Sequence, residues 1–396
     1  MKDNKKTREY IERFCTGCGL CHSLYGINFS YNEKGFPVAQ IDDDPSKYEQ
    51  ICPVFYYHNE CKHDVWGNIQ SALIGYSSND ETRFEASSGG ALTEICSFLL
   101  ETKLVDGIIH TTFDPEDSTR TITCLSKNPE EVKKRCGSRY SISSPLYNIK
   151  EYIEKDQKYA FVGKPCDVMA LRMCMDSDIQ LKNSIRYLLS FFCAGEPSVN
   201  AQNNLLQAIG VDRENCGYIN YRGNGWPGYT TVIDKDGKKH QMEYKKAWGT
   251  YLGRDLRDIC RFCMDGTGEL ADIVCADFWY LDRENKPDFS EHEGRNIIIS
   301  RTQMGDELLK AAVDNGRIIV EGDFTSKIDS EFHLYQPAQY TRKGTMSSSL
   351  LILRTFGRMV PKYSKTFLKK YSSHVTMKVK AKYYIGTLKR IIKGRL

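Results

Sequence analysis

The feature that most constrains the fold of this 396-residue chain is a run of closely spaced cysteines near its N-terminus. Cys15, Cys18 and Cys21 follow one another at three-residue steps, and Cys52, which precedes a proline, supplies a fourth thiol further along. Two such steps and a distant Cys-Pro are the ligand pattern of a [4Fe–4S] cluster. Glycines between the cysteines let the backbone curl, so that its N–H groups point at the cluster sulfides. The sequence therefore predicts an iron–sulfur segment at this end of the chain.

Zinc and disulfide bonds are the alternatives for these four thiols. Zinc usually takes cysteines in two Cys-x-x-Cys knuckles rather than three in a row with one distant, and adjacent Cys-x-x-Cys steps make poor mutual disulfides. Cys61 is close enough to Cys52 in sequence to replace it as a ligand, but it lacks the proline that follows Cys52. The charged start of the chain has no apolar export signal, so we expect its fifteen cysteines in a reducing cytoplasm.

The charge of the chain is unevenly distributed. No acidic residue follows Glu331, while residues 332–396 hold fifteen lysines and arginines, and the net charge of the whole chain is only +4. This segment is predicted to form one or two basic amphipathic helices, which would dock on an anionic membrane surface, bind an acidic partner or fold back on the acidic body. No apolar run approaches the ~20 residues that span a bilayer, and no nucleic-acid-binding module is recognisable. We therefore expect a peripheral membrane contact at most, and no nucleic-acid partner.

From about residue 71 the pattern changes to alternating strands and helices, which is typical of an α/β fold. Lys158–Val162 is predicted to be a buried strand that leads into Cys166, and the strand Arg186–Phe192 leads into Cys193. Because the carboxyl ends of parallel strands share one edge of a sheet, we expect these two cysteines to be neighbours.

A second four-thiolate site would be completed by Cys260 and Cys263, a Cys-x-x-Cys pair. A buried or redox-active pair has the same spacing, so the pair alone does not decide between these interpretations. The sequence marks no Ser/His/Asp arrangement that would support hydrolysis. The candidate acid–base residues are Lys164 and Asp167, which flank Cys166.

Two glycine-containing stretches are candidates for binding a flat, anionic ligand. Ser88-Gly89-Gly90 precedes apolar residues at helical spacing, so Ser88 is the expected N-cap and a phosphate would meet the free N–H groups of the helix start. The second stretch combines an arginine, for a phosphate, with an aromatic ring, for stacking. It consists of Arg222, Gly223, Asn224, Gly225 and Trp226. The alternatives are a helix start without a ligand and a turn that opens a hairpin of residues 230–233 and 240–244.

Taken together, the motifs resemble the coenzyme F420 hydrogenase/dehydrogenase beta-subunit family of iron–sulfur flavoproteins. The resemblance covers about residues 10–325 and keeps the order of the family's motifs, which here are CTGCGLC (15–21), SGG (88–90), GKPCD (163–167), RGNGWPG (222–228), CRFCMDGTGELADI (260–273) and ADFW (276–279). It implies FAD and one or two [4Fe–4S] clusters, which move electrons between a two-electron carrier and one-electron partners. Members include deazaflavin-reducing hydrogenase subunits and the reductase of hydroxymethyl chlorophyll.

The resemblance also implies which residues hold these cofactors. The ligands of the second cluster would be Cys166, Cys193, Cys260 and Cys263. Residues 88–90 and 222–226 would surround the flavin. The chain departs from the family at Ala276, where members often have glycine. It also has only Cys52-Pro53 in place of a second ferredoxin-like half, which fits a single N-terminal cluster.

The expected fold class is therefore α/β, or α+β overall, in four parts. These are a ferredoxin-like [4Fe–4S] segment (1–65), the N-terminal α/β part of the body (66–155), a C-terminal part with the second cluster and the flavin (156–330), and the basic amphipathic tail (331–396). We expect a cytoplasmic oxidoreductase that uses a redox partner protein or a small electron carrier, and a homo-oligomer is compatible with the sequence. The alternatives are a non-catalytic electron-transfer subunit of a larger redox complex and a zinc-stabilised scaffold.

Overall fold

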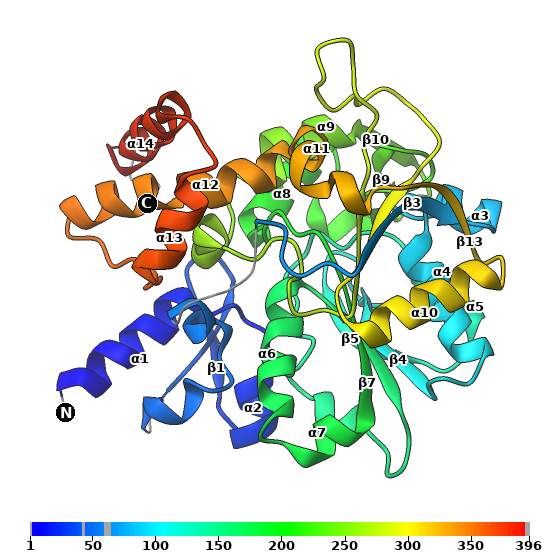
Figure 1. Ribbon diagram of the computed structural model, residues 1–396, viewed down its shortest axis with the longest axis horizontal. Coiled ribbons are helices and arrows are strands. Elements are labelled where there is room, and N and C mark those ends of the chain that lie inside the picture. Colours follow the sequence, from blue (N-terminus) through cyan, green and yellow to red (C-terminus); the bar gives the residue numbers. More distant parts are fainter. Residues whose placement is uncertain (1, 42–43, 59–64, 393–396) are drawn as a thin grey trace.

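An eight-stranded mixed sheet lies at the centre of the protein, whose computed structural model describes residues 2–41, 44–58 and 65–392 (Figure 1). Its strands, in spatial order, are β13 (Ile318–Asp323), β3 (Ser71–Ser77), β12 (Asn296–Ser300), β11 (Ile273–Asp277), β7 (Ile185–Phe191), β6 (Tyr159–Gly163), β4 (Gly107–Phe113) and β5 (Thr121–Ser126). The inner strands β11, β7, β6 and β4 run parallel, and the outer pairings are antiparallel. This architecture confirms the α/β fold class, and it places the carboxyl ends of β6 and β7 at one edge.

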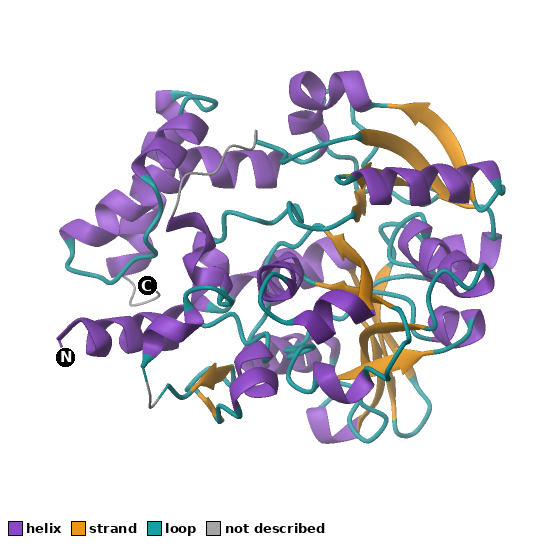
Figure 2. Cartoon of the chain, turned by 60° about the horizontal axis from the view of Figure 1, so that its bottom comes forward, coloured by secondary structure: helices purple, strands orange, loops and turns teal. Residues whose placement is uncertain are grey.

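Helices cover both faces of this sheet, because its central strands are apolar on both sides. Successive residues of a strand point to opposite faces. In β4, Ile108 joins the apolar cluster that contains α4 (Ala91–Glu101) and α10 (Gln303–Asp314), whereas Ile109 joins the cluster that contains α6 (Pro165–Met175). Figure 2 shows helices on both sides of the strands.

Two smaller sheets accompany the central one. They are the hairpin β1 (Phe29–Tyr31) and β2 (Pro37–Ala39), and the three-stranded sheet β8 (Cys216–Asn220), β9 (Tyr229–Asp234) and β10 (Lys239–Glu243). The remaining α-helices are α1 (Lys2–Phe14), α2 (Leu20–Tyr25), α3 (Asp80–Glu85), α5 (Pro129–Lys134), α7 (Ile179–Ser184), α8 (Val199–Ile209), α9 (Tyr244–Lys246), α11 (Ile328–Tyr335), α12 (Pro337–Thr355), α13 (Lys365–Ser372) and α14 (Met377–Ile392). The hairpin of β9 and β10 is the one that the sequence predicts.

The basic C-terminal segment folds back on the body. Leu350 of α12 and Phe367 of α13 belong to the same apolar core as Phe14 at the end of α1. The Lys343 ammonium group is buried and forms an ion pair with the Glu269 carboxylate of the body. Intramolecular pairing, one of the three alternatives for this segment, therefore describes α12.

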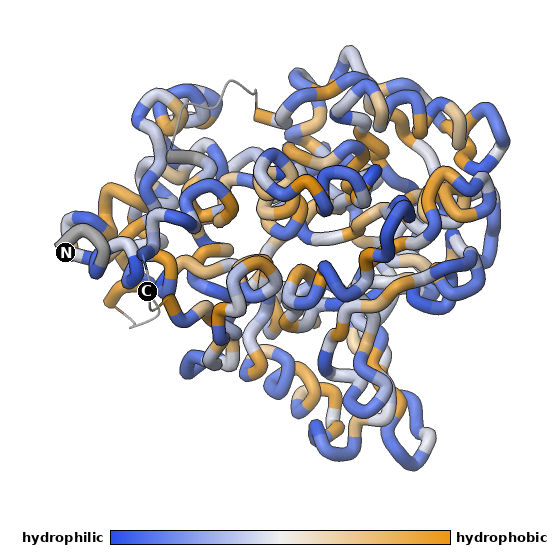
Figure 3. The backbone as a smooth tube through the Cα atoms, turned by 90° about the horizontal axis from the view of Figure 1, so that it is seen from below, coloured by the Kyte–Doolittle hydropathy of each residue, from blue (hydrophilic) through white to orange (hydrophobic). Residues whose placement is uncertain are grey.

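The N-terminal and C-terminal helices lie on the same side of the molecule in all three views (Figures 1, 2 and 3). The Lys362 N–H donates to the Tyr10 hydroxyl at 3.0 Å and ties the two ends together. Hydrophilic and hydrophobic residues alternate along these helices (Figure 3). Within the described ranges, no helix has the length and apolar content to cross a bilayer. Cys61, the alternative ligand named above, lies outside the described residues.

Candidate functional site

The structure brings the four predicted N-terminal thiols together around one small apolar cavity. They form the N-terminal thiol set, which consists of Cys15, Cys18, Cys21 and Cys52. Gly17 and Gly19 have φ values of 71° and 91°, and this positive φ lets the chain curl between α1 and α2. The Gly17 N–H donates to the Cys15 sulfur at 3.4 Å. The backbone therefore faces the thiols in the way that a cluster requires.

Four bare thiolates in this cavity would repel one another with little water to screen them. Burial raises the pKa of the Cys18 thiol to about 12, and burial together with the neighbouring thiols raises the pKa of Cys21. The set therefore fits a cationic group that compensates the thiolate charge, such as the irons of a [4Fe–4S] cluster. No group of three His, Cys, Asp or Glu side chains in the described ranges is spaced to hold a single metal ion.

A second thiol set gathers at the carboxyl edge of the central sheet and consists of Cys166, Cys193, Cys260 and Cys263. Cys166 lies in the first turn of α6, directly after β6, and Cys193 follows the parallel strand β7. Burial raises the pKa of Cys166, and the charges of Cys193 and Cys260 contribute to this shift. Burial raises the pKa of Cys263 as well, again with contributions from Cys260 and Cys193. Cys193 and Cys260 therefore lie within electrostatic reach of both Cys166 and Cys263.

The helix α12 packs against the backbone of the second thiol set. Gln339 Nε2 donates to the carbonyl oxygen of Cys193 at 2.9 Å, and Arg342 donates to that of Ala194 at 3.1 Å. The Arg342 charge also opposes the effect of burial on the pKa of Cys263. The first helix of the basic tail is therefore a wall of the site.

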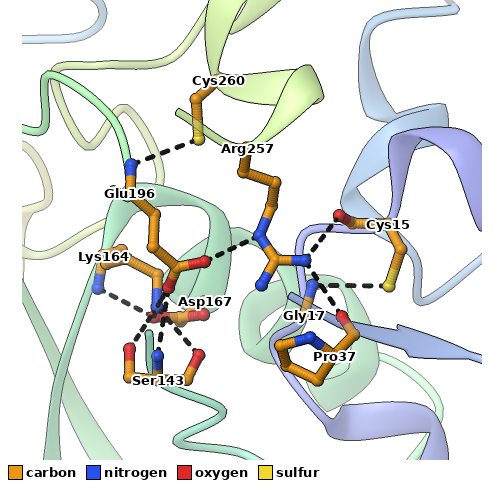
Figure 4. Close-up of polar contacts among 9 residues, drawn as sticks. All are labelled: Cys15, Gly17, Pro37, Ser143, Lys164, Asp167, Glu196, Arg257 and Cys260. Atoms are coloured by element: carbon orange, nitrogen blue, oxygen red, sulfur yellow. Dashed lines mark hydrogen bonds and ion pairs between the residues drawn. The ribbon is translucent and has the colours of Figure 1, made fainter. Parts of the chain in front are cut away.

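A chain of buried charges joins the two thiol sets (Figure 4). Arg257 donates through Nε to Glu196 Oε2 at 2.7 Å and through Nη1 to the carbonyl oxygen of Cys15 at 3.3 Å. Glu196 Oε1 lies 3.3 Å from Lys164 Nζ, and the Glu196 N–H donates to Cys260 Sγ at 3.5 Å. The N-terminal segment and the edge of the sheet are thus linked by ionic contacts as well as by apolar packing.

The candidate acid–base residues Lys164 and Asp167 lie beside the second thiol set. Lys164 Nζ is 3.1 Å from Asp167 Oδ2 and donates to Ser143 Oγ at 2.6 Å. Burial alone would lower the pKa of Lys164, but Asp167 and Glu196 hold it above its ordinary value. Burial raises the pKa of Asp167, and its Oδ1 has no hydrogen-bond partner among the described residues. Lys164 therefore supplies a fixed positive charge, which pairs with the buried Asp167 carboxylate.

A cavity of about 560 Å³ lies beside the second thiol set and extends from Cys193 to the start of α4. Its volume is in the range of cofactor sites. Lys164 and Asp167 line it, as do Ser88 and Gly90 of the first predicted ligand stretch.

The prediction that Ser88 is the N-cap of this helix is wrong. Gly90 occupies that position with a φ of 74°, and no side chain bonds from the cap to the helix. The Ser88 hydroxyl instead donates to the carbonyl oxygen of Arg295 at 2.9 Å, and Asn296 Oδ1 accepts the Ala91 N–H at 3.1 Å. Asn296 of β12 thus accepts the hydrogen bond of the first helical N–H group. No side chain caps the helix at Gly90, and Leu92 and Thr93 of its first turn line the cavity. A helix start of this kind suits an anion.

Arg139 is the cavity residue best suited to bind an anion. Among the described residues, its hydrogen-bond partners are the carbonyl oxygens of Ser138 and Cys136, at 3.3 and 3.5 Å. Its Nε is buried and has no partner there, and no described carboxylate forms an ion pair with it. Burial lowers its pKa. An arginine in this state fits a phosphate group, because the phosphate would supply the missing acceptors and charge.

The second predicted ligand stretch contributes only Arg222 to the cavity wall. Arg222 lines the cavity, whereas Gly223, Asn224, Gly225 and Trp226 do not. Arg222 makes two parallel hydrogen bonds of 2.9 and 2.8 Å to the Asp277 carboxylate, so its guanidinium is already paired. Trp226 is buried, stacks on Trp279 with 4.7 Å between ring centroids, and donates its indole N–H to Asp277. The aromatic residues that do line the cavity are Tyr140, Phe191, Phe192, Tyr244, Trp248, Trp279 and Phe289.

Sequence reasoning missed three charged residues of this region. Arg257 lies three residues before Cys260, and Glu196 lies three residues after Cys193. Proximity to predicted ligands was thus a usable signal for both. Arg139 stands in a loop with no motif around it, so no sequence signal marked it.

Comparisons with known proteins match most of the chain. The model for the N-terminal part of the coenzyme F420 hydrogenase/dehydrogenase beta subunit matches residues 72–150, and the model for its C-terminal part matches residues 156–323. The coenzyme F420 hydrogenase subunit beta of Methanococcus voltae is 23% identical over 306 residues, which is 75% of this chain and 99% of that protein. The protein of the same name from Methanothermobacter thermautotrophicus is 21% identical over 259 residues, 64% of this chain and 84% of its own length.

Two further similarities come from a plant enzyme and a solved structure. The chloroplastic 7-hydroxymethyl chlorophyll a reductase of Oryza sativa subsp. japonica is 23% identical over 304 residues, covering 74% of this chain and 60% of that protein. A chain of the F420-reducing [NiFe] hydrogenase complex from Methanosarcina barkeri superimposes with a TM-score of 0.59 and 18% identity. It covers 77% of this chain and 100% of its own, and it shows that the two share a fold.

Proposed function

Because the chain belongs to the coenzyme F420 hydrogenase/dehydrogenase beta-subunit family, we propose that it is an iron–sulfur flavoprotein oxidoreductase. Its relatives are redox proteins and support an electron-transfer role. The observation that carries the finer proposal is the position of Cys193, which belongs to the second thiol set and also lines the 560 Å³ cavity. A flavin held in this cavity would border a cluster held by that set.

Each thiol set would hold one [4Fe–4S] cluster through its four sulfurs. Arg139 and the N–H groups at the start of α4 would hold the phosphates of FAD, and Tyr140, Tyr244 and Trp248 would contact its rings. When bound, these cofactors would exchange a hydride with a two-electron carrier, a deazaflavin or another, and single electrons with a partner. The chain's own residues supply orientation, charge and exclusion of water.

Buried charged residues around the second thiol set hold their charges in fixed positions beside the proposed route of the electrons. Lys164 and Arg257 each share the Glu196 carboxylate, and all three side chains are largely buried. Asp167 lines the cavity with one unpartnered oxygen among the described residues. We propose that Lys164 and Asp167 act as a buried ion pair beside the flavin, in which Lys164 keeps the carboxylate in place.

An anaerobic iron and flavin count, with the absorption spectrum before and after dithionite, tests this function. About eight iron and one FAD per chain, with bleaching on reduction, is the expected result. Turnover with deazaflavin, nicotinamide and ferredoxin should then be measured. Zinc without iron, or iron without flavin, would contradict the flavoenzyme proposal.

The alternative is a non-catalytic electron-transfer subunit of a larger redox complex. The likeness to a chain of a hydrogenase complex favours it. In that case the purified chain would contain its clusters but would turn over no two-electron carrier until its partner is added. Steady-state assays with and without a catalytic subunit expressed alongside it separate the two functions.

We also propose that the outer face of α14 docks on an anionic membrane surface, which would place the protein at the cytoplasmic side as a peripheral protein. Met377, Ile385 and Ile392 are 76%, 50% and 73% exposed and fall on one stripe of the helix. Exposed lysines at 378, 382 and 389 form the adjacent stripe, and no acidic residue follows Glu331. Exposed aliphatic side chains beside lysines match a lipid headgroup region better than they match a purely polar partner.

Cosedimentation with vesicles of anionic phosphatidylglycerol or neutral phosphatidylcholine tests this surface. We expect binding to the anionic vesicles only, weakened by salt and lost in the double variant Lys378→Glu/Lys382→Glu. Lys310→Glu, an exposed lysine of α10, is the matched control and should bind as the wild type does. Equal behaviour of the double variant and this control would refute membrane docking.

A further inference from the structure

Arg257 occupies a position between the two thiol sets that ligand binding alone does not explain. Its guanidinium is buried, at 4% exposure, and reaches from the edge of the central sheet to the N-terminal segment. Nη1 donates to the carbonyl oxygens of Cys15 and Pro37, and Nε donates to Glu196 (Figure 4). The side chain therefore makes three hydrogen bonds that fix it in one orientation.

The remaining nitrogen of this side chain has no acceptor in the protein. Arg257 Nη2 is buried and lacks a hydrogen-bond partner among the described residues. It lies against the loop of the N-terminal thiol set, since a Cβ added at Gly17 would stand 2.5 Å from it. Gly17 is thus required both for its positive φ and for this close approach. A buried N–H group without an acceptor is costly, and cluster sulfur beside this loop would supply one.

The ion pair of Arg257 with Glu196 is oriented along the line between the two sets. The Arg257 guanidinium contacts the N-terminal segment through Cys15, and the Glu196 carboxylate contacts Lys164 beside the second set, whose Cys260 Sγ accepts the Glu196 backbone N–H at 3.5 Å. The cation also lies 4.5 Å from the centre of the Phe36 ring, which excludes water from it. Charges act strongly over short distances in such an environment.

We propose that Arg257 is a positioning residue that raises the reduction potential of the N-terminal cluster above that of the second cluster. The inference rests on the proposed function, because it requires both clusters. A positive charge and an N–H donor beside a cluster stabilise its reduced, more negative form. Electrons that enter at the flavin would then pass from the second cluster to the N-terminal cluster, which becomes the exit toward the redox partner.

The test is a redox titration followed by electron paramagnetic resonance, on protein whose iron content is first shown to be full. In Arg257→Gln, the ratio of reduced to oxidised N-terminal cluster at a fixed ambient potential should fall about tenfold, which is about 59 mV for one electron. The ratio for the second cluster should change less. Arg186→Gln, at the opposite end of β7 from Cys193, is the matched control and should leave both ratios unchanged.

Arg257→Lys keeps the positive charge but loses the donor that Nη2 provides. The ratio of reduced to oxidised N-terminal cluster should fall about threefold in this variant, and it replaces Arg257→Gln if the glutamine variant does not retain its iron. Full iron content with unchanged potentials in the measured variant would overturn the role of Arg257 and leave the proposed function intact. A wild-type chain without iron would overturn the proposed function itself.

Discussion

The ion pair of Arg222 with Asp277 should be among the most stability-determining contacts of the cavity wall. The two hydrogen bonds measure 2.9 and 2.8 Å, and the side chains are 4% and 19% exposed. Removing one member of a buried pair costs about 3–5 kcal/mol, because the other charge is left uncompensated. Asp277→Ala also removes the acceptor of the Trp226 indole N–H. The bond of Arg222 to Pro227 and its contact with the Tyr244 ring, at 4.4 Å, remain and limit the loss.

We therefore expect Asp277→Ala to lower the free energy of unfolding by about 3–5 kcal/mol, and Asp277→Asn by about 1–3 kcal/mol, since the amide oxygen still accepts one N–H. Urea titrations followed by circular dichroism measure the change, with Asp236→Ala in the exposed turn between β9 and β10 as the control. The double variant Arg222→Met/Asp277→Ala should be more stable than Asp277→Ala, because no buried charge is left alone. A loss below about 1 kcal/mol in Asp277→Ala, or a double variant whose loss equals the sum of the two single losses, would refute this reasoning.

Three further perturbations address the thiol sets, the cavity and the pH dependence. Cys18→Ser and Cys193→Ser should each lower the iron content from about eight to about four per chain, measured by a colorimetric iron assay; retention of all iron in either variant would remove that cysteine from the ligand set. Arg139→Gln should weaken FAD binding roughly 10- to 100-fold through loss of a charged hydrogen bond, measured by flavin fluorescence, whereas Arg120→Gln, at a 65% exposed side chain, should not. Burial and two nearby arginines lower the pKa of His110 from 6.5 to about 4. The unfolded chain then binds a proton that the native protein does not, so stability should fall by about 3 kcal/mol as the pH falls from 6.5 to 4. His110→Gln should make the urea midpoint less dependent on pH between 6.5 and 4. An unchanged pH dependence would show that other groups control the stability in this range.

Local sequence patterns predicted those parts of the structure that local contacts determine. The strands before Cys166 and Cys193 are apolar runs that a sheet must bury, and parallel pairing of β6 and β7 brings the two cysteines to one edge. The loop of the N-terminal thiol set follows from its glycines, whose positive φ is available to few other residues. These predictions needed no knowledge of distant partners.

The predictions that differ from the structure all involve partners far away in sequence. Ser88 is not the N-cap, because Asn296, 208 residues further along, satisfies the helix start. Arg222 is paired with Asp277 of β11, which no periodicity near Arg222 could indicate. Folding back of the tail was one of the alternatives, but composition could not name Glu269 as the partner of Lys343. Each of these is a side chain whose partner is chosen by the tertiary fold.

The closure of the second thiol set by α12 has a consequence for biogenesis. Gln339 and Arg342, which hold the backbone around Cys193, are synthesised after Cys275, the last cysteine of the chain. Every proposed cysteine ligand is therefore synthesised before the part of α12 that contacts the second set. Delivery of iron to the second set would therefore have an open route while translation is still under way, and the docking of α12 would then close it. A nascent chain arrested before Pro337 should accept both clusters and retain the second one poorly.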